Sequence, residues 1–326
     1  MADQAHNATG QYQPQSTIDL PVIFSWPPRL LAAIRYLVVD MLFPWGYLYI
    51  VMAFISWAYL MPALALMSEF DFEWIALVWL RNAFWLTLVA GGLHWWLYIR
   101  RGQGTEFKFH DRWLATDDQN FLWGNQVKDN LFWSIASGVT ICTAWEAVTW
   151  WIYANGLVTA SFNLTSPEYF LVCVLGVFFW GTIHFYFGHR LLHWQPLYRI
   201  SHELHHRNRN TGPWTGVAMH PLEHLVYFSV FPLIWFVPVH PVAVILMSIY
   251  MLVGPAPSHT GFDYVRIGSF RVSTGDWFHQ LHHQYFSFNF GNTMSPLDWL
   301  FGSWHDGSKA SLQRQKRRLH RHRQVI

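Results

Sequence analysis

The sequence predicts an all-α integral membrane protein: a helical bundle of about four spans plus a kinked or re-entrant helical pair, with a helical cap on the cytoplasmic side. Three observations lead to this fold class. Hydrophobic residues make up 52% of the 326 residues and charged residues only 12%, about half the charged fraction that is usual in soluble domains. Several apolar runs are long enough to cross a bilayer. Histidines number 19, as many as Asp and Glu together, and most of them recur at short, regular spacings.

The same composition excludes several classes of protein. An intrinsically disordered chain, a coiled coil and a secreted disulfide scaffold would all need a different balance of residues. The two cysteines, Cys142 and Cys173, both lie inside apolar runs, so no disulfide framework is indicated. The basic residues of 304–326 are not interleaved with exposed aromatics in a folded module, which argues against a nucleic-acid partner.

The order of polar and apolar segments divides the chain into four regions. The first is polar, rich in Gln and Pro, and lacks the basic start and short apolar run of a signal peptide, so we expect a disordered tail. The regions are a tail at 1–28, an N-terminal transmembrane region at 29–167, a histidine-rich domain at 168–305 and a basic C-terminal tail at 306–326.

Four apolar stretches are long enough to span the membrane, because a hydrocarbon core of about 30 Å takes about 20 helical residues. They are roughly 41–67, 74–99, 131–154 and 168–190. A fifth stretch, 225–257, is interrupted by five prolines. Proline removes a backbone donor and kinks or ends a helix, so this stretch is compatible with two spans or with a helical hairpin that dips into one leaflet of the membrane. Of these we expect the hairpin or a tightly kinked pair of helices.

The charges of the short loops predict the orientation. Arg29 and Arg35 precede the first span, Arg100 and Arg101 follow the second, and Arg190 follows the fourth, while the loops after the first and third spans carry no basic residue. By the positive-inside rule, the N-terminus and the histidine-rich segment then face the cytoplasm. The expected location is the endoplasmic reticulum membrane of a eukaryote or the inner membrane of a bacterium.

Three short motifs place eight histidines at helical spacings. They are His189 and His193; then His202, His205 and His206; then His279, His282 and His283. Residues three or four apart share one face of a helix, with Cβ atoms about 5–6 Å apart. Neutral imidazole is a good ligand for iron, zinc, copper and nickel, and eight nitrogens suffice for two ions. Without a metal, packed imidazoles would repel one another when protonated and would lack partners when neutral.

At these motifs the sequence becomes recognisable. The string HRLLHWQPLYRISHELHHRNRNTGPWTGVAMHPLEH (189–224) resembles the first half of the sterol desaturase/fatty acid hydroxylase superfamily. SHTGFDY (258–264) and HQLHHQYFSFNFGNTMSPLDWLFGSW (279–304) look like its second half, closest to the branch of C5-sterol desaturases and C4-methyl sterol oxidases. The resemblance covers about residues 180–305.

This resemblance implies a membrane-bound, non-haem di-iron oxygenase that hydroxylates or desaturates a C–H bond of a sterol-like or fatty acyl lipid with O2. Electrons would come ultimately from NAD(P)H, through a separate cytochrome b5-like or ferredoxin-like carrier and its reductase. We find no dinucleotide-binding glycine motif in the sequence, and Arg207, Arg209 and Arg266 are suited to steer an acidic carrier. Carried over by position, the metal ligands are His189, His193, His202, His205, His206, His259, His279, His282 and His283.

Five further residues are candidates for the site. Fatty acid 2-hydroxylases have a second histidine where Asp263 stands, so Asp263 is a candidate acceptor that orients an imidazole. The family often has Asp where Thr182 stands, and His184 is an additional histidine before the first motif. The other candidates are His220, Glu223 and His224 of the HPLEH element, where we expect Glu223 to fix a ligand or a loop by hydrogen bonding.

Other functions compete with this interpretation. A carotenoid or other isoprenoid hydroxylase of the same superfamily would carry the same motifs. A divalent-metal transporter would place His or Asp near the middle of its spans, whereas these motifs lie at and beyond the membrane edge. A non-catalytic lipid-binding scaffold would have lost histidines of the motifs, and all nine positions are intact. Glu146, an acid within the third span, is either functional or paired with a neighbouring helix.

Overall fold

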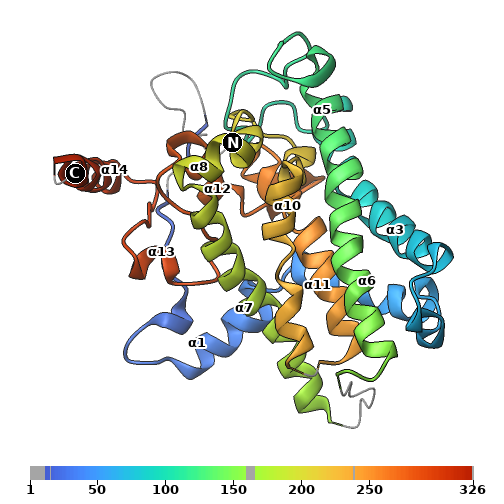
Figure 1. Cartoon of the computed structure of the whole chain (residues 1–326). Coiled ribbons are helices and arrows are strands. Elements are labelled where there is room, and N and C mark those ends of the chain that lie inside the picture. The colour runs from blue at the N-terminus through green and yellow to red at the C-terminus, as the bar shows by residue number, and fades with distance from the viewer. Residues whose placement is uncertain (1–11, 15, 159–165, 238, 325–326) are drawn as a thin grey trace.

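The computed structural model describes residues 12–14, 16–158, 166–237 and 239–324 as a bundle of long helices with a polar cap at one end (Figure 1). In chain order the helices are α1 (Leu30–Arg35), α2 (Trp45–Ile55), α3 (Phe72–Leu86), α4 (Gly92–His94), α5 (Gln126–Phe132), α6 (Thr140–Ala154), α7 (Pro167–Leu192), α8 (Gln195–Leu197), α9 (Glu203–His206), α10 (Pro221–Tyr227), α11 (Pro241–Val253), α12 (Asp276–Tyr285), α13 (Leu297–Leu300) and α14 (Lys309–Gln324). The strands β1 (Tyr264–Ile267) and β2 (Phe270–Ser273) lie between α11 and α12.

Four helices of the described residues are long and apolar enough to cross a membrane. They are Phe72–Ile99, which contains α3 and α4; Gln126–Ala154, which contains α5 and α6; Pro167–Leu192, which is α7; and Pro241–His259, which begins with α11. The first three confirm the expected spans. Local residues define their starts: the Asp71 side chain accepts from the Glu73 backbone N–H at 2.7 Å before α3, and Pro167 occupies the first turn of α7.

The first span differs in the structure from the expected 41–67, both in where it starts and in being bent. Leu30–Asp40 and Trp45–Leu60 are two helical segments that meet at 59°, so the apolar run starts about ten residues earlier than expected and is bent. The break falls just before α2, where Pro44 has no N–H to continue the helical hydrogen bonds. Residues Leu64–Ser68 form a separate short 3-10 turn beyond the end of the bent pair.

The proline-rich stretch 225–257 forms a hairpin, as expected, but it reaches the far end of the bundle instead of dipping into one leaflet, and its second arm, Pro241–His259, is long and apolar enough to cross a membrane. It descends through α10 and a 3-10 turn at Phe231–Trp235 and returns through α11. The tip lies at the far end of the bundle, because the Tyr153 hydroxyl donates to the Val239 carbonyl at 3.3 Å and the His240 ring lies 5.4 Å from that of Phe170. Twelve of the thirteen residues of α11 are buried, so this helix is the centre of the bundle, between α2, α3, α6 and α7. Its uniformly apolar sequence reflects that position.

The cap gathers the segments that follow α7 and α11, together with the loop between α4 and α5 (Figure 1). Its antiparallel hairpin of β1 and β2, closed by Gly268 and Ser269, is the one departure from an all-α fold among the named elements of the described residues. Gly268 has a φ of +61°, which a two-residue hairpin turn requires. The hairpin follows His259 directly and connects it to α12.

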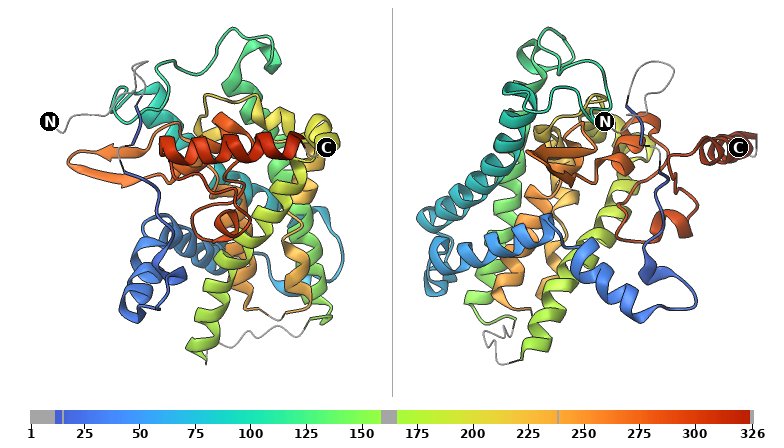
Figure 2. Two further views of the ribbon diagram at one scale, coloured as in Figure 1. Left: turned by 90° about the vertical axis from the view of Figure 1, so that its left-hand side faces the viewer. Right: turned by 180° about the vertical axis from the view of Figure 1, so that it is seen from behind.

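Residues before and after the bundle also contact the cap. The N-terminal segment runs along the outside from α1 to the cap (Figure 2), where the Tyr12 hydroxyl donates to Asp263 Oδ2 at 2.8 Å and the Ile18 N–H donates to the Asp306 carbonyl at 3.0 Å. Residues 1–11 of the expected tail lie outside the described residues. At the other end, most of the expected basic tail is helical, as α14.

Candidate metal centre

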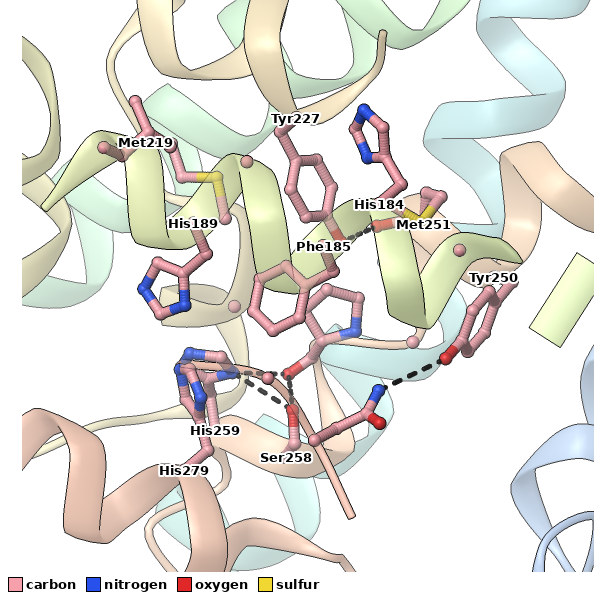
Figure 3. A pocket seen from close by; sticks show the side chains of 18 of the residues that line it. His184, Phe185, His189, Met219, Tyr227, Tyr250, Met251, Ser258, His259 and His279 are labelled. Carbon is pink, nitrogen blue, oxygen red and sulfur yellow. Dashed lines mark hydrogen bonds between the residues drawn. The ribbon is translucent and has the colours of Figure 1, made fainter. Parts of the chain in front are cut away.

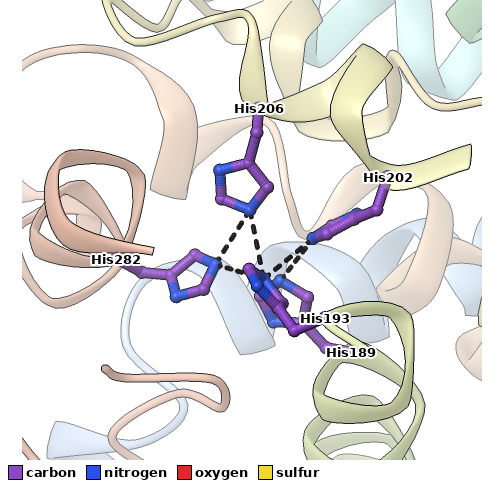
Figure 4. A group of neighbouring side chains, drawn as sticks. All are labelled: His189, His193, His202, His206 and His282. Atoms are coloured by element: carbon purple, nitrogen blue, oxygen red, sulfur yellow. Dashed lines mark hydrogen bonds between the residues drawn. The ribbon is translucent and has the colours of Figure 1, made fainter. Parts of the chain in front are cut away.

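Nine histidines from four distant segments meet inside the cap, and they are the nine that the resemblance implied. They fall into two groups, in each of which the candidate ligand atoms all lie within 4.8 Å of one another. The first, called here the A cluster, is His189, His193, His202, His206 and His282 (Figure 4). The second, the B cluster, is His205, His259, His279 and His283. Each of the three motifs contributes to the A cluster, and two of them contribute to both clusters.

The Nε2 atoms of the A cluster point at a common centre, as Figure 4 shows. His189 Nε2 lies 3.0 Å from His202 Nε2, and His193 Nε2 lies 3.1 Å from the Nε2 atoms of both His202 and His282. His206 Nε2 lies 3.2 Å from that of His193 and 3.1 Å from that of His282. For comparison, an ion with six ligands at about 2.1 Å holds neighbouring ligand atoms about 3.0 Å apart.

These contacts are not ordinary hydrogen bonds, because the other ring nitrogens fix the tautomers. His189 Nδ1 lies 2.5 Å from the Phe290 carbonyl, and His282 Nδ1 lies 2.6 Å from the Phe288 carbonyl. His202 Nδ1 lies 2.7 Å from Glu223 Oε1. A carbonyl or carboxylate oxygen only accepts, so each Nδ1 carries the proton and each Nε2 presents a lone pair. Three lone pairs therefore face one point, an arrangement that repels itself unless a cation lies between them.

In the B cluster, too, hydrogen bonding and burial leave imidazole nitrogens available to bind a metal ion. His259 Nδ1 donates to the Pro255 carbonyl at 2.8 Å, which leaves the His259 Nε2 lone pair facing inward. This Nε2, His279 Nε2 and both ring nitrogens of His283 are buried and have no hydrogen-bond partner among the residues that the structure describes. Buried polar atoms are nearly always paired, so a group of unpaired imidazole nitrogens fits a site for a metal ion. The residues of both clusters thus suit a pair of transition-metal ions.

Burial keeps these imidazoles in the form that binds metals. Desolvation lowers the pKa of His202, His206 and His282 well below the usual value, and neighbouring histidines lower it further. The same causes lower the pKa of His279 and His283. These side chains are therefore neutral at pH 7, and a neutral imidazole is the ligand form.

Two aspartates hold the ligand segments in place, and the sequence analysis did not single them out. Asp276 Oδ2, at the start of α12, accepts from the Gly261 N–H at 2.7 Å and so ties the loop after His259 to the helix that carries His279. Asp298 accepts from the Phe290 N–H at 2.9 Å and fixes the carbonyl that faces His189. In the sequence each of them is a single acid near the third motif, and a single acid does not show whether it holds a ligand segment or lies on the surface.

All five further candidates lie outside both clusters, and for four of them no hydrogen bond or ring contact with a cluster histidine is found among the described residues. His184 Nε2 contacts Ser229 Oγ at 3.0 Å, and His220 accepts from the Leu222 N–H at the start of α10. The two ring nitrogens of His224 are bonded to Ser137 Oγ and the Val217 carbonyl. Asp263, where burial raises the pKa to about 6, accepts from Tyr12 rather than from an imidazole. These candidates are His184, His220, His224 and Asp263.

Glu223, the fifth candidate, contacts a cluster histidine as expected. It is fully buried, and its Oε1 accepts from His202 Nδ1 at 2.7 Å. We predict that Glu223→Ala lowers the affinity of the A cluster for iron about 10–100-fold, because the His202 ring loses the acceptor that fixes its orientation. Competition with a soluble chelator measures this affinity. Glu223→Gln keeps an acceptor oxygen and is expected to retain most of it; wild-type affinity in the alanine variant would contradict the positioning role.

A mainly apolar cavity opens onto both clusters (Figure 3). His189 and His202 of the A cluster and His259 and His279 of the B cluster line one side of it. Its other walls come from the middle of α7, from α10 and from α11, and include Phe185, Leu192, Met219, Tyr227, Tyr250 and Met251. Figure 3 shows the rings of His189, His259 and His279 on one side and Tyr250 on the other. The cavity therefore leads from the two histidine clusters into the apolar bundle.

The region that contains both clusters is similar in sequence to a known protein family. The model of the fatty acid hydroxylase family matches residues 173–303, which contain all nine clustered histidines. This region is therefore similar to the fatty acid hydroxylase family. The matched segment begins inside α7 and ends after α13, so it comprises most of α7, the hairpin around α11 and most of the cap.

Sterol desaturases are similar to the same region of the chain. A Δ(7)-sterol 5(6)-desaturase of Eremothecium gossypii is 29% identical over 124 residues, 37% of this chain and 34% of the relative. The enzyme ERG3 of Saccharomyces cerevisiae is 29% identical over 122 residues, 36% of this chain and 32% of the relative. For erg3C of Aspergillus fumigatus the identity is 29% over 147 residues, 38% and 45%. The chain thus matches less than half the length of these relatives, and no solved structure matches it.

Proposed function

We propose that the chain is a membrane-bound, non-haem di-iron oxygenase that hydroxylates or desaturates a C–H bond of a lipid with O2. The observation that carries this proposal is the pair of histidine clusters that open together onto one apolar cavity. The fatty acid hydroxylase family and the sterol desaturase relatives support an oxidoreductase that acts on lipids. When bound, the two irons would supply the activation of O2 that an unreactive C–H bond requires, with electrons ultimately from NAD(P)H.

Residues of the chain orient the imidazoles of the A cluster and exclude water from the reacting groups. Backbone oxygens and Glu223 hold the Nδ1 protons of three A-cluster histidines, so their Nε2 atoms stay aimed at the centre. The Phe185 ring stacks on His189 with 4.9 Å between ring centroids and forms part of the apolar cavity wall beside the A cluster. Apolar walls on α10 and α11 accept the hydrocarbon of the substrate and exclude water.

We further propose that a separate cytochrome b5-like or ferredoxin-like protein, with its reductase, delivers the electrons from the cytoplasmic side. A second, more polar pocket reaches the A cluster at His193 from the outside of the cap, beside Arg190. Of the three arginines that we expected to steer the carrier, Arg207 and Arg266 are ion-paired with Asp129 and Glu106, whereas Arg209 lies over the ring of Phe286, which lines this pocket. Arg190 and Arg209 are therefore better supported than Arg207 and Arg266 as contacts for an acidic carrier.

Metal analysis and lipid profiling test the proposed function. We expect the purified protein to contain about two irons per chain, one for each cluster, and to consume O2 only when iron and a reductant are present. Profiling the lipids of the host with and without the gene would then identify the substrate and separate hydroxylation from desaturation. Stoichiometric zinc with no iron-dependent O2 consumption would contradict the proposal.

A further inference from the structure

The cavity wall opposite the histidines carries a small polar group. Tyr250 on α11 and Asn292 after α12 both line the cavity, and the buried Thr182 of α7 lies behind them. Asn292 Nδ2 donates to Thr182 Oγ1 at 3.1 Å and faces the Tyr250 hydroxyl at 3.5 Å, a contact that is drawn in Figure 3. The Tyr250 and Thr182 hydroxyl oxygens are 3.1 Å apart. Three polar side chains therefore lie together at one wall of a mainly apolar cavity.

This group has more protons to donate than strong acceptors to receive them. Asn292 Oδ1 already accepts from the Met294 N–H at 3.0 Å. One hydroxyl proton lies between Tyr250 and Thr182, and the other reaches only the thioether Sδ of Met294, at 3.8 Å from the Tyr250 oxygen and 4.0 Å from that of Thr182. A thioether is a weak acceptor. If Thr182 donates to Tyr250, then the Tyr250 proton is the one that lacks a strong partner.

An oxygen atom of a bound lipid would complete this arrangement. Tyr250 lines the cavity, whereas Thr182 is fully buried, so an acceptor that enters the cavity meets the Tyr250 hydroxyl. With Thr182 donating to Tyr250 and Tyr250 donating to the ligand, both hydroxyl protons gain an oxygen acceptor. A neutral hydroxyl or carbonyl suits the site, because the cavity-lining residues on this wall carry no charge to pair with an ionised headgroup.

Helix geometry limits how far this oxygen lies from the metal centre. Thr182 and His189 are seven residues apart on α7, which is about two turns, so they project from the same face of the helix. At about 1.5 Å per residue their Cα atoms are about 10 Å apart along the axis. Because Tyr250 bonds to Thr182 and His189 belongs to the A cluster, we expect a lipid held at Tyr250 to present to the clusters a carbon on the order of 10 Å from its oxygen.

We propose that Tyr250, supported by Asn292 and Thr182, binds a hydroxyl or carbonyl oxygen of the substrate and thereby selects a lipid that is oxidised within about 10 Å of that oxygen. The inference rests on the proposed function and names its substrate class. A compact lipid alcohol such as a 3-hydroxysterol meets the condition, whereas a long acyl chain that is oxidised far from its polar end does not.

A comparison of two ligands in two proteins tests this. The full-length protein in lipid nanodiscs is titrated with a radiolabelled 3-hydroxysterol and with its 3-deoxy analogue. We expect the wild type to bind the alcohol about tenfold more tightly, and Tyr250→Phe, which removes only the hydroxyl, to bind both with nearly equal affinity. Thr182→Val is expected to reduce the preference less, because the Tyr250 hydroxyl is still present.

Tyr153→Phe is the matched control, since it removes a buried tyrosine hydroxyl at the far end of the bundle. It should keep the tenfold preference, and a thermal melt shows whether each variant is folded. A wild type that does not prefer the alcohol, or a folded Tyr250→Phe variant that keeps the preference, overturns the inference. Iron-dependent oxidation of lipid without any such preference would overturn this inference alone, whereas a Tyr250-dependent preference without O2 consumption would overturn the proposed function alone.

Discussion

Replacement of His205 by alanine is expected to reduce the iron content from about two per chain to about one and to lower lipid turnover by about a thousandfold or more, roughly 4 kcal/mol of activation free energy. The B cluster has four histidines, so the change leaves three. His282→Ala leaves four imidazoles in the A cluster; we expect it to lose less iron than His205→Ala while also abolishing turnover, because both ions take part in the reaction. Iron analysis and O2 consumption on the same preparation measure both effects.

His220→Asn is the matched control for these variants. His220 was also a candidate ligand, but its side chain accepts from the Leu222 N–H at the start of α10, and asparagine caps a helix in the same way. This variant should keep about two irons per chain and most of its turnover. Full activity in His205→Ala, or loss of one iron in His220→Asn, would show that the clusters are assigned wrongly.

Loss of the Glu146 carboxylate is expected to destabilise the protein by about 3–5 kcal/mol. Arg81 Nη2 lies 2.5 Å from Glu146 Oε2, and both side chains are buried between α3 and α6. Asn82 Nδ2 and Trp150 Nε1 also donate to this carboxylate. With Glu146→Ala the Arg81 charge remains buried without a counter-ion, so the free energy of unfolding falls. Thermal unfolding in detergent or nanodiscs measures the loss.

Two further variants show whether the buried charge is the cause. Glu106→Ala removes the acid of an exposed pair with Arg266, where nearly half of the arginine side chain is accessible, and we expect a change of less than about 1 kcal/mol. The double variant Arg81→Met with Glu146→Leu removes both charges and should recover much of the stability that Glu146→Ala loses. A double variant as unstable as the single one would mean that packing, rather than the unpaired charge, accounts for the effect.

Much of the bundle was predictable because the relevant signals are local. Long apolar runs gave the positions of α3, α6 and α7, and the prolines of 225–257 gave a hairpin that returns to the side of its start. The bend between α1 and α2 was missed, because Leu30–Asp40 is too short to register as a span by itself. The partner of Glu146 was missed as well, because Arg81 stands in another span, 65 residues away, and pairing across that distance depends on how α3 packs against α6.

The membership of the two clusters was beyond the sequence for a similar reason. His205 and His206 are adjacent in the chain but belong to different clusters, since successive residues on a helix point about 100° apart. The oxygens that fix the tautomers are mostly backbone carbonyls, at Pro255, Phe288 and Phe290, and every residue has a carbonyl, so no pattern of side chains reveals them.

By itself the sequence determined the kind of chemistry: histidines three and four residues apart share a helix face whatever the rest of the chain does, and apolar runs of about 20 residues need a membrane or a core. Only the tertiary structure decided that nine imidazoles form a group of five and a group of four, that α11 is buried at the centre of the bundle, and that Tyr250 lies across the cavity from the clusters. These features depend on how α7, α11 and α12 cross, which is set by packing between residues far apart in the chain.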